Sequence, residues 1–320
     1  MVKRAAEGEV GWWTGVPTQL LAKECLVTAD PNNEISPRLA VYKLTFAIPS
    51  DPEHRLIDKA IPHAQLDLAV GDVVKIVIPD YKPKSYSVSA LRLDAEPPQF
   101  DVTFKVYPNG RASGHLDSLQ IEDSIHTFGK LANRVRNTRG NFVGIVAYGV
   151  GITEAWPVAK AELRKHESSS VTLLWANRSL ADVFWKEEID HVSKLYPERL
   201  VVRYIFSREP KPVLVDGMVQ PDIDAQGNTT MYGRVNADVL KEVFQPKDPS
   251  EALFLVVGTK EMMRYTYDEL LTEQMGYRMP QNAFLVKKEK GEKEGKTHKK
   301  DSKRKRESVE QKDESVHFQE

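Results

Sequence analysis

NFVGIVAYGVGITEAWPVAKAELRK, residues 141–165, is the stretch around which the second half of the chain is organised. Its apolar run has the length of a buried strand, and from residue 154 apolar residues recur at helical spacing. Between them lie Gly149 and Gly151, which allow a ligand to approach the backbone, and Thr153, which opens the helix. This strand, turn and helix start favour a phosphate ligand, because the first helical N–H groups are unpaired. Alternatively, the turn is an ordinary connection that needs glycine for its backbone angles.

Strands and helices alternate on both sides of this stretch. Near-continuous apolar strands that alternate with helices predict a parallel sheet covered on both faces. Ligands bind such sheets at the carboxyl ends of the strands, where the glycine turn lies. The expected elements are strands at 171–176, 200–206, 252–258 and 283–286 and helices at 182–195, 236–244 and 260–275.

The preceding part of the chain, from about residue 23 to residue 134, has a different pattern. Short apolar or alternating runs are separated there by segments rich in turn-forming residues, which favours an antiparallel barrel or sandwich. One helix is expected at about 113–119. The expected strands lie within 21–29, 37–48, 68–79, 84–91, 99–108 and 121–129.

Length and composition fit this reading. The 320 residues suit about two domains, and the 41% of hydrophobic residues suffice for two cores. A net charge of −1 gives no general preference for nucleic acid or membranes. Cys25 is the only cysteine, which excludes an intramolecular disulfide and a cysteine-rich metal site. No apolar run has the length of a membrane span, the N-terminus makes a poor signal peptide, and the expected location is cytoplasmic.

Residues 288–320 are almost wholly polar and show no periodicity, so we expect a disordered charged tail. The basic cluster at 299–306 fits a nuclear address or a patch for an anionic surface. A solvated tail without a specific partner is the interpretation we favour, and a nucleic-acid partner is not expected.

Four motifs stand in order along the chain: KSYS at 84–87, GRAS at 110–113, the glycine turn, and VGTKEM at 257–262. With the predicted barrel and sheet, they resemble the ferredoxin–NADP reductase superfamily. Segments 104–119 and 173–189 are similar to its cytochrome b5 reductase branch. The resemblance implies two domains, an antiparallel β-barrel that binds FAD and a parallel-sheet, Rossmann-like domain that binds NAD(P). The implied boundaries are 1–22 for an N-terminal extension, 23–136 for the barrel, 137–287 for the α/β domain and 288–320 for the tail.

The resemblance implies a flavin site on the barrel. In the family's Arg-x-Tyr-Ser/Thr motif the ring lies against the flavin and the hydroxyl lies near its reactive nitrogen, and Tyr86 and Ser87 match these positions. Lys84 replaces the arginine that contacts the pyrophosphate; it keeps the charge but loses the bidentate fork, so weaker FAD binding is expected. Alternatively, Tyr86 is a barrel-face aromatic, and Ser113 is a plain helix cap. The implied flavin contacts are Lys84, Ser85, Tyr86, Ser87, Thr103, Lys105, Tyr107, Gly110, Arg111, Ala112 and Ser113, of which Lys105 and Tyr107 would need no function in an edge strand.

The resemblance also implies a nicotinamide dinucleotide site. Within the family's Ala-Gly-Gly-Thr-Gly-Ile-Thr pattern, Tyr148 replaces a glycine and Val150 a threonine. Val257 replaces a cysteine that assists hydride transfer, and Thr259 replaces a proline, so we expect slower hydride transfer or looser nicotinamide placement. The implied contacts are Gly149, Gly151, Thr153, Ser207, Arg208, Tyr232, Gly258 and Met262, with Tyr86, Ser87 and Thr153 as the catalytic residues.

The choice of nucleotide depends on the residues after the strand at 200–206. NADP-using members of the family carry a serine–arginine pair there, as Ser207 and Arg208 do, and NADH-using members tend to place an acid first. The neighbouring Glu209, and Thr230 where a lysine is usual, depart from that pattern. The resemblance leans to NADPH over NADH; a polar loop without this function is the alternative.

The expected function is therefore an FAD-dependent NAD(P)H oxidoreductase that passes electrons to an unknown acceptor, either a small molecule or a redox protein. The alternative is a reductase-fold binding or scaffold module whose flavin chemistry is weakened or lost. It is motivated by the departures at Lys84, Tyr148, Val257 and Thr259. His115 and His126 are single histidines without a metal-ligand pattern, and no metal is expected.

Overall fold

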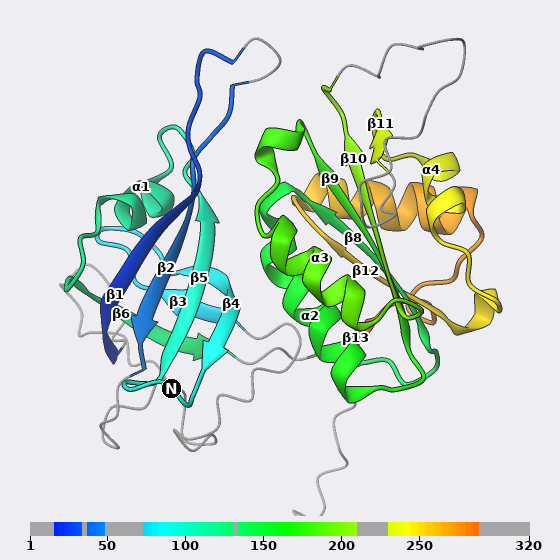
Figure 1. Cartoon of the computed structure of the whole chain (residues 1–320), viewed down its shortest axis with the longest axis horizontal. Coiled ribbons are helices and arrows are strands. Elements are labelled where there is room, and N and C mark those ends of the chain that lie inside the picture. The colour runs from blue at the N-terminus through cyan, green and yellow to red at the C-terminus, as the bar shows by residue number, and fades with distance from the viewer. Residues whose placement is uncertain (1–15, 34–36, 49–72, 131–133, 210–229, 288–320) are drawn as a thin grey trace, which may run out of the picture. The chain divides into compact units, whose positions relative to one another are not determined.

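The computed structural model describes residues 16–33, 37–48, 73–130, 134–209 and 230–287 (Figure 1). The described residues up to Val286 belong to one unit by their contacts, and residues from Lys287 onward belong to a second. The predicted tail at 288–320 and most of the predicted N-terminal extension lie outside the described residues. None of the helices in the described ranges combines the length and the apolar character that crossing a membrane requires.

The first half of the chain forms a closed antiparallel barrel with strand order β1-β2-β5-β4-β3-β6. Its first strand begins at Val16, inside the stretch that the sequence analysis assigned to an extension. Large apolar side chains fill the barrel, and the rings of Phe46 and Phe100 stack with their centroids 5.5 Å apart. The elements are β1 (Val16–Val27), β2 (Val41–Ala47), β3 (Val73–Ile76), β4 (Lys84–Arg92), β5 (Gln99–Lys105), α1 (Arg111–Ser118) and β6 (Ser124–Lys130).

The second half forms a five-stranded parallel sheet with strand order β11-β10-β9-β8-β12. A two-stranded sheet of β7 (Arg134–Arg136) and β13 (Leu285–Lys287) accompanies it. The strands are β8 (Phe142–Tyr148), β9 (Ser170–Asn177), β10 (Leu200–Phe206), β11 (Thr230–Tyr232) and β12 (Ala252–Val257). The helices are α2 (Ile152–Lys165), α3 (Lys186–Leu195), α4 (Ala237–Val243), α5 (Lys260–Arg264) and the π-helix η4 (Tyr265–Gln274), with 3₁₀ turns η1 (Gly149–Gly151), η2 (Leu180–Asp182) and η3 (Pro249–Glu251).

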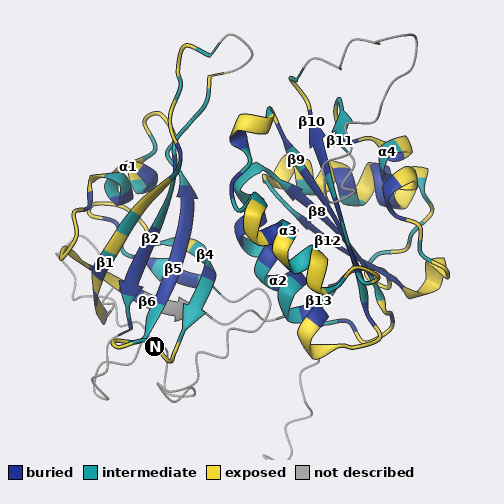
Figure 2. Ribbon diagram, in the orientation of Figure 1, coloured by how far each residue is buried: buried dark blue, intermediate teal, exposed yellow. Residues whose placement is uncertain are grey.

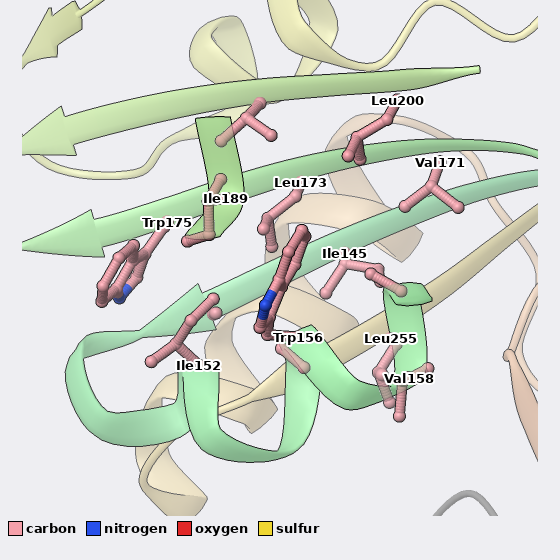
Figure 3. Close-up of a cluster of buried hydrophobic side chains, with 14 of the residues drawn as sticks. Ile145, Ile152, Trp156, Val158, Val171, Leu173, Trp175, Ile189, Leu200 and Leu255 are labelled. Carbon is pink, nitrogen blue, oxygen red and sulfur yellow. The ribbon is translucent and has the colours of Figure 1, made fainter. Parts of the chain in front are cut away.

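Helices cover both faces of the sheet, and the strands between them are buried on both sides (Figure 2). On one face Trp156 of α2 and Ile189 of α3 pack against the strand residues Leu173 and Trp175 (Figure 3). On the other face α4 and η4 pack against the sheet. Each large side chain buried in this way contributes about 1.5–3 kcal/mol, so the two layers hold the carboxyl ends of the strands firmly in place.

Two predicted helices differ in detail from the observed ones. The helix expected at 182–195 begins at Lys186, because Trp185 adopts a left-handed conformation with φ of 59° and η2 closes its own turn before it. The helix expected at 260–275 is α-helical only to Arg264 and continues as η4. π-Helical turns are rare and are frequent at functional sites.

Candidate nucleotide-binding site

The site lies where the strand order of the sheet reverses. From β8 the chain adds β9, β10 and β11 on one side and then returns to place β12 on the other side of β8. Ala147 at the end of β8 is paired with Val257 at the end of β12, so the turns that follow both strands start side by side. Ligands of open parallel sheets bind in the crevice at such a reversal.

The two glycines of the turn after β8 serve different purposes. Gly149 has a φ of 53°, the left-handed region that glycine adopts without cost, and its carbonyl accepts a hydrogen bond of 2.8 Å from the indole N–H of Trp175. Gly151 lies so close to β12 that a Cβ atom there would be 2.6 Å from the Val257 carbonyl oxygen. Helix α2 starts directly after Gly151 without a capping hydrogen bond from that residue, and Thr153 lies buried in its first turn. The start of α2 can therefore receive a phosphate.

On the barrel, the GRAS motif closes the loop between β5 and α1. Gly110 occupies the N-cap position of α1, and Ser113 lies inside the helix, so the alternative in which Ser113 caps it is wrong. The Ser113 hydroxyl accepts a hydrogen bond from the Tyr107 N–H at 3.1 Å and donates one to the Gly110 carbonyl at 3.3 Å. A Cβ at Gly110 would collide with that hydroxyl, so a larger residue there would displace the Ser113 side chain.

Two cations share one aromatic ring at the edge of this loop. The Lys84 ammonium lies 5.1 Å from the ring centroid of Tyr81, and the Arg111 guanidinium carbon lies 5.6 Å from it. Both distances are within the range of a cation–π interaction. Two positive charges near a single ring can attract an anion. Tyr81, which contacts both cations, was not among the predicted residues.

Tyr86 and Ser87 of β4 lie beside elements of the α/β half. Burial, with a smaller contribution from Tyr107, raises the pKa of Tyr86 to about 12, so its hydroxyl stays neutral. The Tyr86 ring meets Phe104 edge-on, with centroids 6.4 Å apart. The Ser87 hydroxyl donates a hydrogen bond of 3.2 Å to the carboxylate of Glu154, in the first turn of α2. Glu154 leaves no distinctive signal in the sequence, because a carboxylate in the first turn of a helix is common.

The two predicted residues of β5 differ in their surroundings. Thr103 is buried, and its hydroxyl bonds to that of Ser89 at 3.0 Å. Lys105 forms a 3.7 Å ion pair with Asp182 of η2; burial lowers the Lys105 pKa, and the Asp182 charge opposes that effect. Because β5 lies between β2 and β4 in the barrel, the alternative that placed Lys105 in an edge strand is wrong.

One cavity of about 1360 Å³ brings these parts together. Tyr81, Glu154, Asn177, Arg178 and Arg234 also line it, although the sequence analysis did not predict them. Among the described residues, Tyr232 is the predicted site residue that lies outside its lining. The predicted residues that line it are Lys84, Ser85, Tyr86, Ser87, Thr103, Lys105, Tyr107, Gly110, Arg111, Ala112, Ser113, Gly149, Gly151, Thr153, Ser207, Arg208, Gly258 and Met262.

The side chain of Tyr148, one of the departures from the family pattern, has a defined place. Its hydroxyl lies 2.7 Å from the hydroxyl of Thr266 in η4, and burial is the largest cause of its raised pKa. A Cβ at Gly258 would be 3.0 Å from the Tyr148 ring, so the ring packs on the bare backbone of that glycine. The extra bulk at position 148 is therefore accommodated by the missing side chain of Gly258, and its hydroxyl is bonded to Thr266.

Three arginines lie around the ends of β9, β10 and β11. Arg178, Arg208 and Arg234 all line the cavity, next to Ser207. The carboxylate of Glu209 accepts a hydrogen bond of 2.8 Å from the Leu180 N–H, so this acid is engaged with the backbone at the start of η2.

Comparisons with known proteins define the class of this protein. Residues 51–133 match the family model described as Oxidoreductase FAD-binding domain, and residues 145–268 match that of Oxidoreductase NAD-binding domain. Together the two models cover most of the chain, which therefore has one FAD-binding and one NAD-binding oxidoreductase domain. The two domains in this order, with the relatives given below, support its assignment to the ferredoxin–NADP reductase superfamily, near the cytochrome b5 reductase branch.

Individual relatives agree with this assignment. NADH-cytochrome b5 reductase 1 of Aspergillus oryzae is 26% identical over 252 residues, which cover 77% of this chain and 76% of that protein. NADH-cytochrome b5 reductase 1 of Arabidopsis thaliana is 31% identical over 37% of this chain, and the match spans 43% of its length, less than half. The cytochrome b5 reductase domain of Ulva prolifera nitrate reductase has the same fold, with a TM-score of 0.62, 17% identity, and coverage of 84% of this chain and 96% of that one.

The residues around the cavity fit the dinucleotides that such domains bind. Helices α1 and α2 both begin at the cavity without a side-chain cap, and such helix starts suit a pyrophosphate. The cations on Tyr81 match phosphate charge. Asn177 also contributes a buried amide nitrogen that lacks a hydrogen-bond partner within the described ranges.

Proposed function

We propose that this protein is an FAD-dependent NAD(P)H oxidoreductase that takes a hydride from NAD(P)H and delivers electrons to a separate acceptor. The observation that carries the proposal is the single cavity lined by the barrel motifs and by the turns at the strand-order reversal. When bound, the flavin supplies the chemistry of accepting a hydride and releasing electrons.

The residues of the chain then have these roles. Lys84 and Arg111 pair with the flavin pyrophosphate, and Tyr86 provides an aromatic surface for the flavin ring. The Ser87 hydroxyl donates a hydrogen bond to the Glu154 carboxylate. A proton can therefore pass between Ser87 Oγ and Glu154 Oε2. The glycine turn and the start of α2 receive phosphate oxygens of the nicotinamide dinucleotide.

We further propose that NADPH is the preferred donor. The relatives named above are NADH enzymes by name, but the arginines at 178, 208 and 234 line the cavity and Glu209 is engaged by a backbone N–H. A guanidinium pairs well with a 2′-phosphate, and NADH lacks that group.

The variants Arg208→Gln and Arg164→Gln test this preference. Arg164 is an exposed arginine in the last turn of α2 and serves as the matched control. Because a hydrogen bond to a charged group contributes about 1.5–3 kcal/mol, we expect R208Q to raise the Kd for NADPH at least ~10-fold and to leave NADH unchanged. R164Q should change neither. A wild-type protein that binds NADH more tightly, or an equal effect of R208Q on both nucleotides, would contradict the preference.

For the acceptor we propose a redox protein, because the relatives are named cytochrome b5 reductases. The test compares NADPH oxidation by the holoprotein with cytochrome b5 and with ferricyanide as acceptors. Turnover with both supports a protein acceptor of the cytochrome b5 type. Turnover with ferricyanide alone rejects cytochrome b5 as the acceptor.

The second candidate function is a binding module without flavin chemistry. The observation that favours it is the Tyr148 ring packed on Gly258, beside Val257, where the family carries a cysteine. This candidate predicts that the purified protein takes up no FAD and oxidises neither nucleotide with any acceptor.

A further inference from the structure

Asn177, the last residue of β9, has a buried side-chain donor without a partner. The residue is 7% exposed and lines the cavity. Its amide nitrogen Nδ2 makes no hydrogen bond in the part of the chain that the structure describes. Leaving a buried donor unpaired costs free energy, and native proteins therefore pair almost all of them. An unpaired donor beside a ligand cavity indicates that the partner is the ligand.

The backbone carbonyl of Asn177 is hydrogen-bonded to a neighbouring residue of the site. Its carbonyl accepts hydrogen bonds from the Ser207 N–H at 3.0 Å and from the Ser207 hydroxyl at 3.4 Å. Two residues earlier on the same strand, the Trp175 indole N–H donates a hydrogen bond to the Gly149 carbonyl. Asn177 therefore lies on the strand between the glycine turn of β8 and the serine–arginine pair of β10.

We propose that Asn177 is a nucleotide-binding residue whose Nδ2 donates a hydrogen bond to a phosphate or ribose oxygen in the adenosine half of the dinucleotide. The inference rests on the proposed function and extends it to a residue with no assigned role. The adenosine half is indicated because β9 and β10 lie on the side of β8 away from β12, next to Ser207. The acceptor is an oxygen, because Nδ2 only donates.

This arrangement has a consequence that a purely structural asparagine lacks. A substitution that removes the unpaired donor relieves its cost in the free protein, and the same substitution removes a contact from the complex. Stability of the nucleotide-free protein and affinity for the nucleotide should therefore change in opposite directions.

The test uses the full-length, FAD-loaded protein with Asn177→Leu and Asn177→Asp. Calorimetric titration with NADP⁺, ADP-ribose and nicotinamide mononucleotide separates the two halves of the dinucleotide, and ADP-ribose reads the adenosine half without a 2′-phosphate. We expect N177L to weaken NADP⁺ and ADP-ribose about 10-fold, to leave the mononucleotide unchanged, and to keep or raise the thermal midpoint of the nucleotide-free protein. N177D should weaken both adenosine ligands further, because it places a carboxylate near phosphate.

Asn282→Leu is the matched control. Asn282 is also a buried asparagine, 6% exposed, but its Nδ2 donates to the carbonyls of Ala252 at 2.7 Å and Pro249 at 3.2 Å. This variant should lower the thermal midpoint, as a satisfied structural asparagine does.

Two results would overturn the inference, and they are distinguishable. If wild-type protein binds ADP-ribose and N177L binds it equally well, Asn177 is not a nucleotide contact, and the proposed function stands. If wild-type protein binds neither NADP⁺ nor ADP-ribose, the proposed function and the inference fail together.

Discussion

Tyr81 shows how a single residue changes the reading of the flavin site. Lys84 stands at a family arginine position, which by itself predicts weaker FAD binding. The structure holds Arg111 over the same Tyr81 ring as Lys84, at the start of α1. We therefore propose that Arg111 supplies to the flavin pyrophosphate the bidentate fork that Lys84 lacks.

We expect Arg111→Gln to weaken FAD binding more than the conservative change Lys84→Arg does. Removing a charge-assisted contact with phosphate costs about 1.5–3 kcal/mol, which corresponds to a rise in Kd of about 10- to 100-fold. Lys84→Arg should keep or improve affinity, because it adds a fork next to the first one. Fluorescence titration of the flavin-free protein with FAD measures both effects.

Lys82→Gln is the control for this titration. Lys82 is an exposed lysine next to Tyr81 in the sequence and does not line the cavity. Equal losses for R111Q and K82Q would mean that only the net positive charge near the cavity matters. The role given to Arg111 would then be withdrawn.

The sequence predicted many of the individual residues that line the cavity. It missed residues whose role in the site depends on contacts with distant parts of the chain. Tyr81 becomes relevant because two cations from separate motifs meet on its ring. Glu154 becomes relevant because Ser87, 67 positions earlier in the sequence, donates a hydrogen bond to its carboxylate. Asn177 stands out because its amide is buried without a partner. None of these relations leaves a pattern in the local sequence.

The turn after β8 is the element to which the proposed function assigns the phosphates of the nicotinamide dinucleotide. Glycine is needed at positions 149 and 151 for different physical reasons, so replacing each by alanine should have different effects on stability. At Gly149 a Cβ meets nothing within 4 Å, and the cost is the left-handed backbone alone. At Gly151 the Cβ would collide with the Val257 carbonyl of the neighbouring strand.

We expect Gly149→Ala to lower the free energy of unfolding by about 1 kcal/mol. Gly151→Ala should cost about 1–3 kcal/mol or more, because β8 and β12 must move apart to admit the methyl group. Urea unfolding of the two variants measures the difference. A larger loss at Gly149 than at Gly151 would show that the close approach of Gly151 to Val257 does not exist in solution.

The sequence predicted the elements well where a hydrophobic period defines them. The alternation of buried strands and helices after residue 140 identified the parallel sheet, and the strands before it identified the barrel. The short strands β7 and β11 were not expected, and the strand expected at 283–286 is β13, which pairs with β7 outside the parallel sheet. Two details of the helices also escaped because periodicity does not carry them. The left-handed Trp185 separates η2 from α3, and the change from α5 to η4 involves the Thr266 hydroxyl, which donates to the Met262 carbonyl at 2.9 Å. Strand order also escaped, since it depends on packing between distant segments.

At the scale of the whole molecule, the segment that connects the barrel to the sheet contains an ion pair between the half-buried Arg136 and the buried Glu162. Arg136 of β7 donates from Nε to both carboxylate oxygens of Glu162 in α2, at 3.0 and 2.9 Å. The next residue, Asn137, donates to the carbonyls of Gln281 at 2.8 Å and Ala283 at 3.1 Å, near the end of the α/β half. Loss of this cluster should therefore destabilise the α/β half.

Glu162 gives this cluster a pH dependence. Burial is the largest single influence on its pKa and raises it, but hydrogen bonds from Arg136 and Ser169 and the charges of Arg136 and His166 outweigh burial, so the pKa is lowered from 4.5. A carboxylate with a lowered folded pKa stabilises the protein above the unfolded value, and that contribution is lost as the pH falls through the folded value.

We therefore expect the free energy of unfolding to fall as the pH drops below about 4.5, with Glu162 as a contributor. Glu162→Gln should lower stability at neutral pH by about 1–3 kcal/mol, because it removes the counter-charge of the half-buried Arg136, and should flatten the acid limb. Urea midpoints measured from about pH 3 to about pH 7 provide the comparison. An acid limb of the same slope in wild type and E162Q would assign the pH dependence to other carboxylates.

The visible absorption spectrum of the purified full-length protein, recorded anaerobically before and after addition of NADPH, is the most direct test of the proposed oxidoreductase function. We predict a yellow protein whose flavin bands bleach on addition of NADPH, and more slowly with NADH. A colourless protein that takes up no added FAD, or a flavin that neither nucleotide reduces, would contradict the oxidoreductase function and favour the binding module.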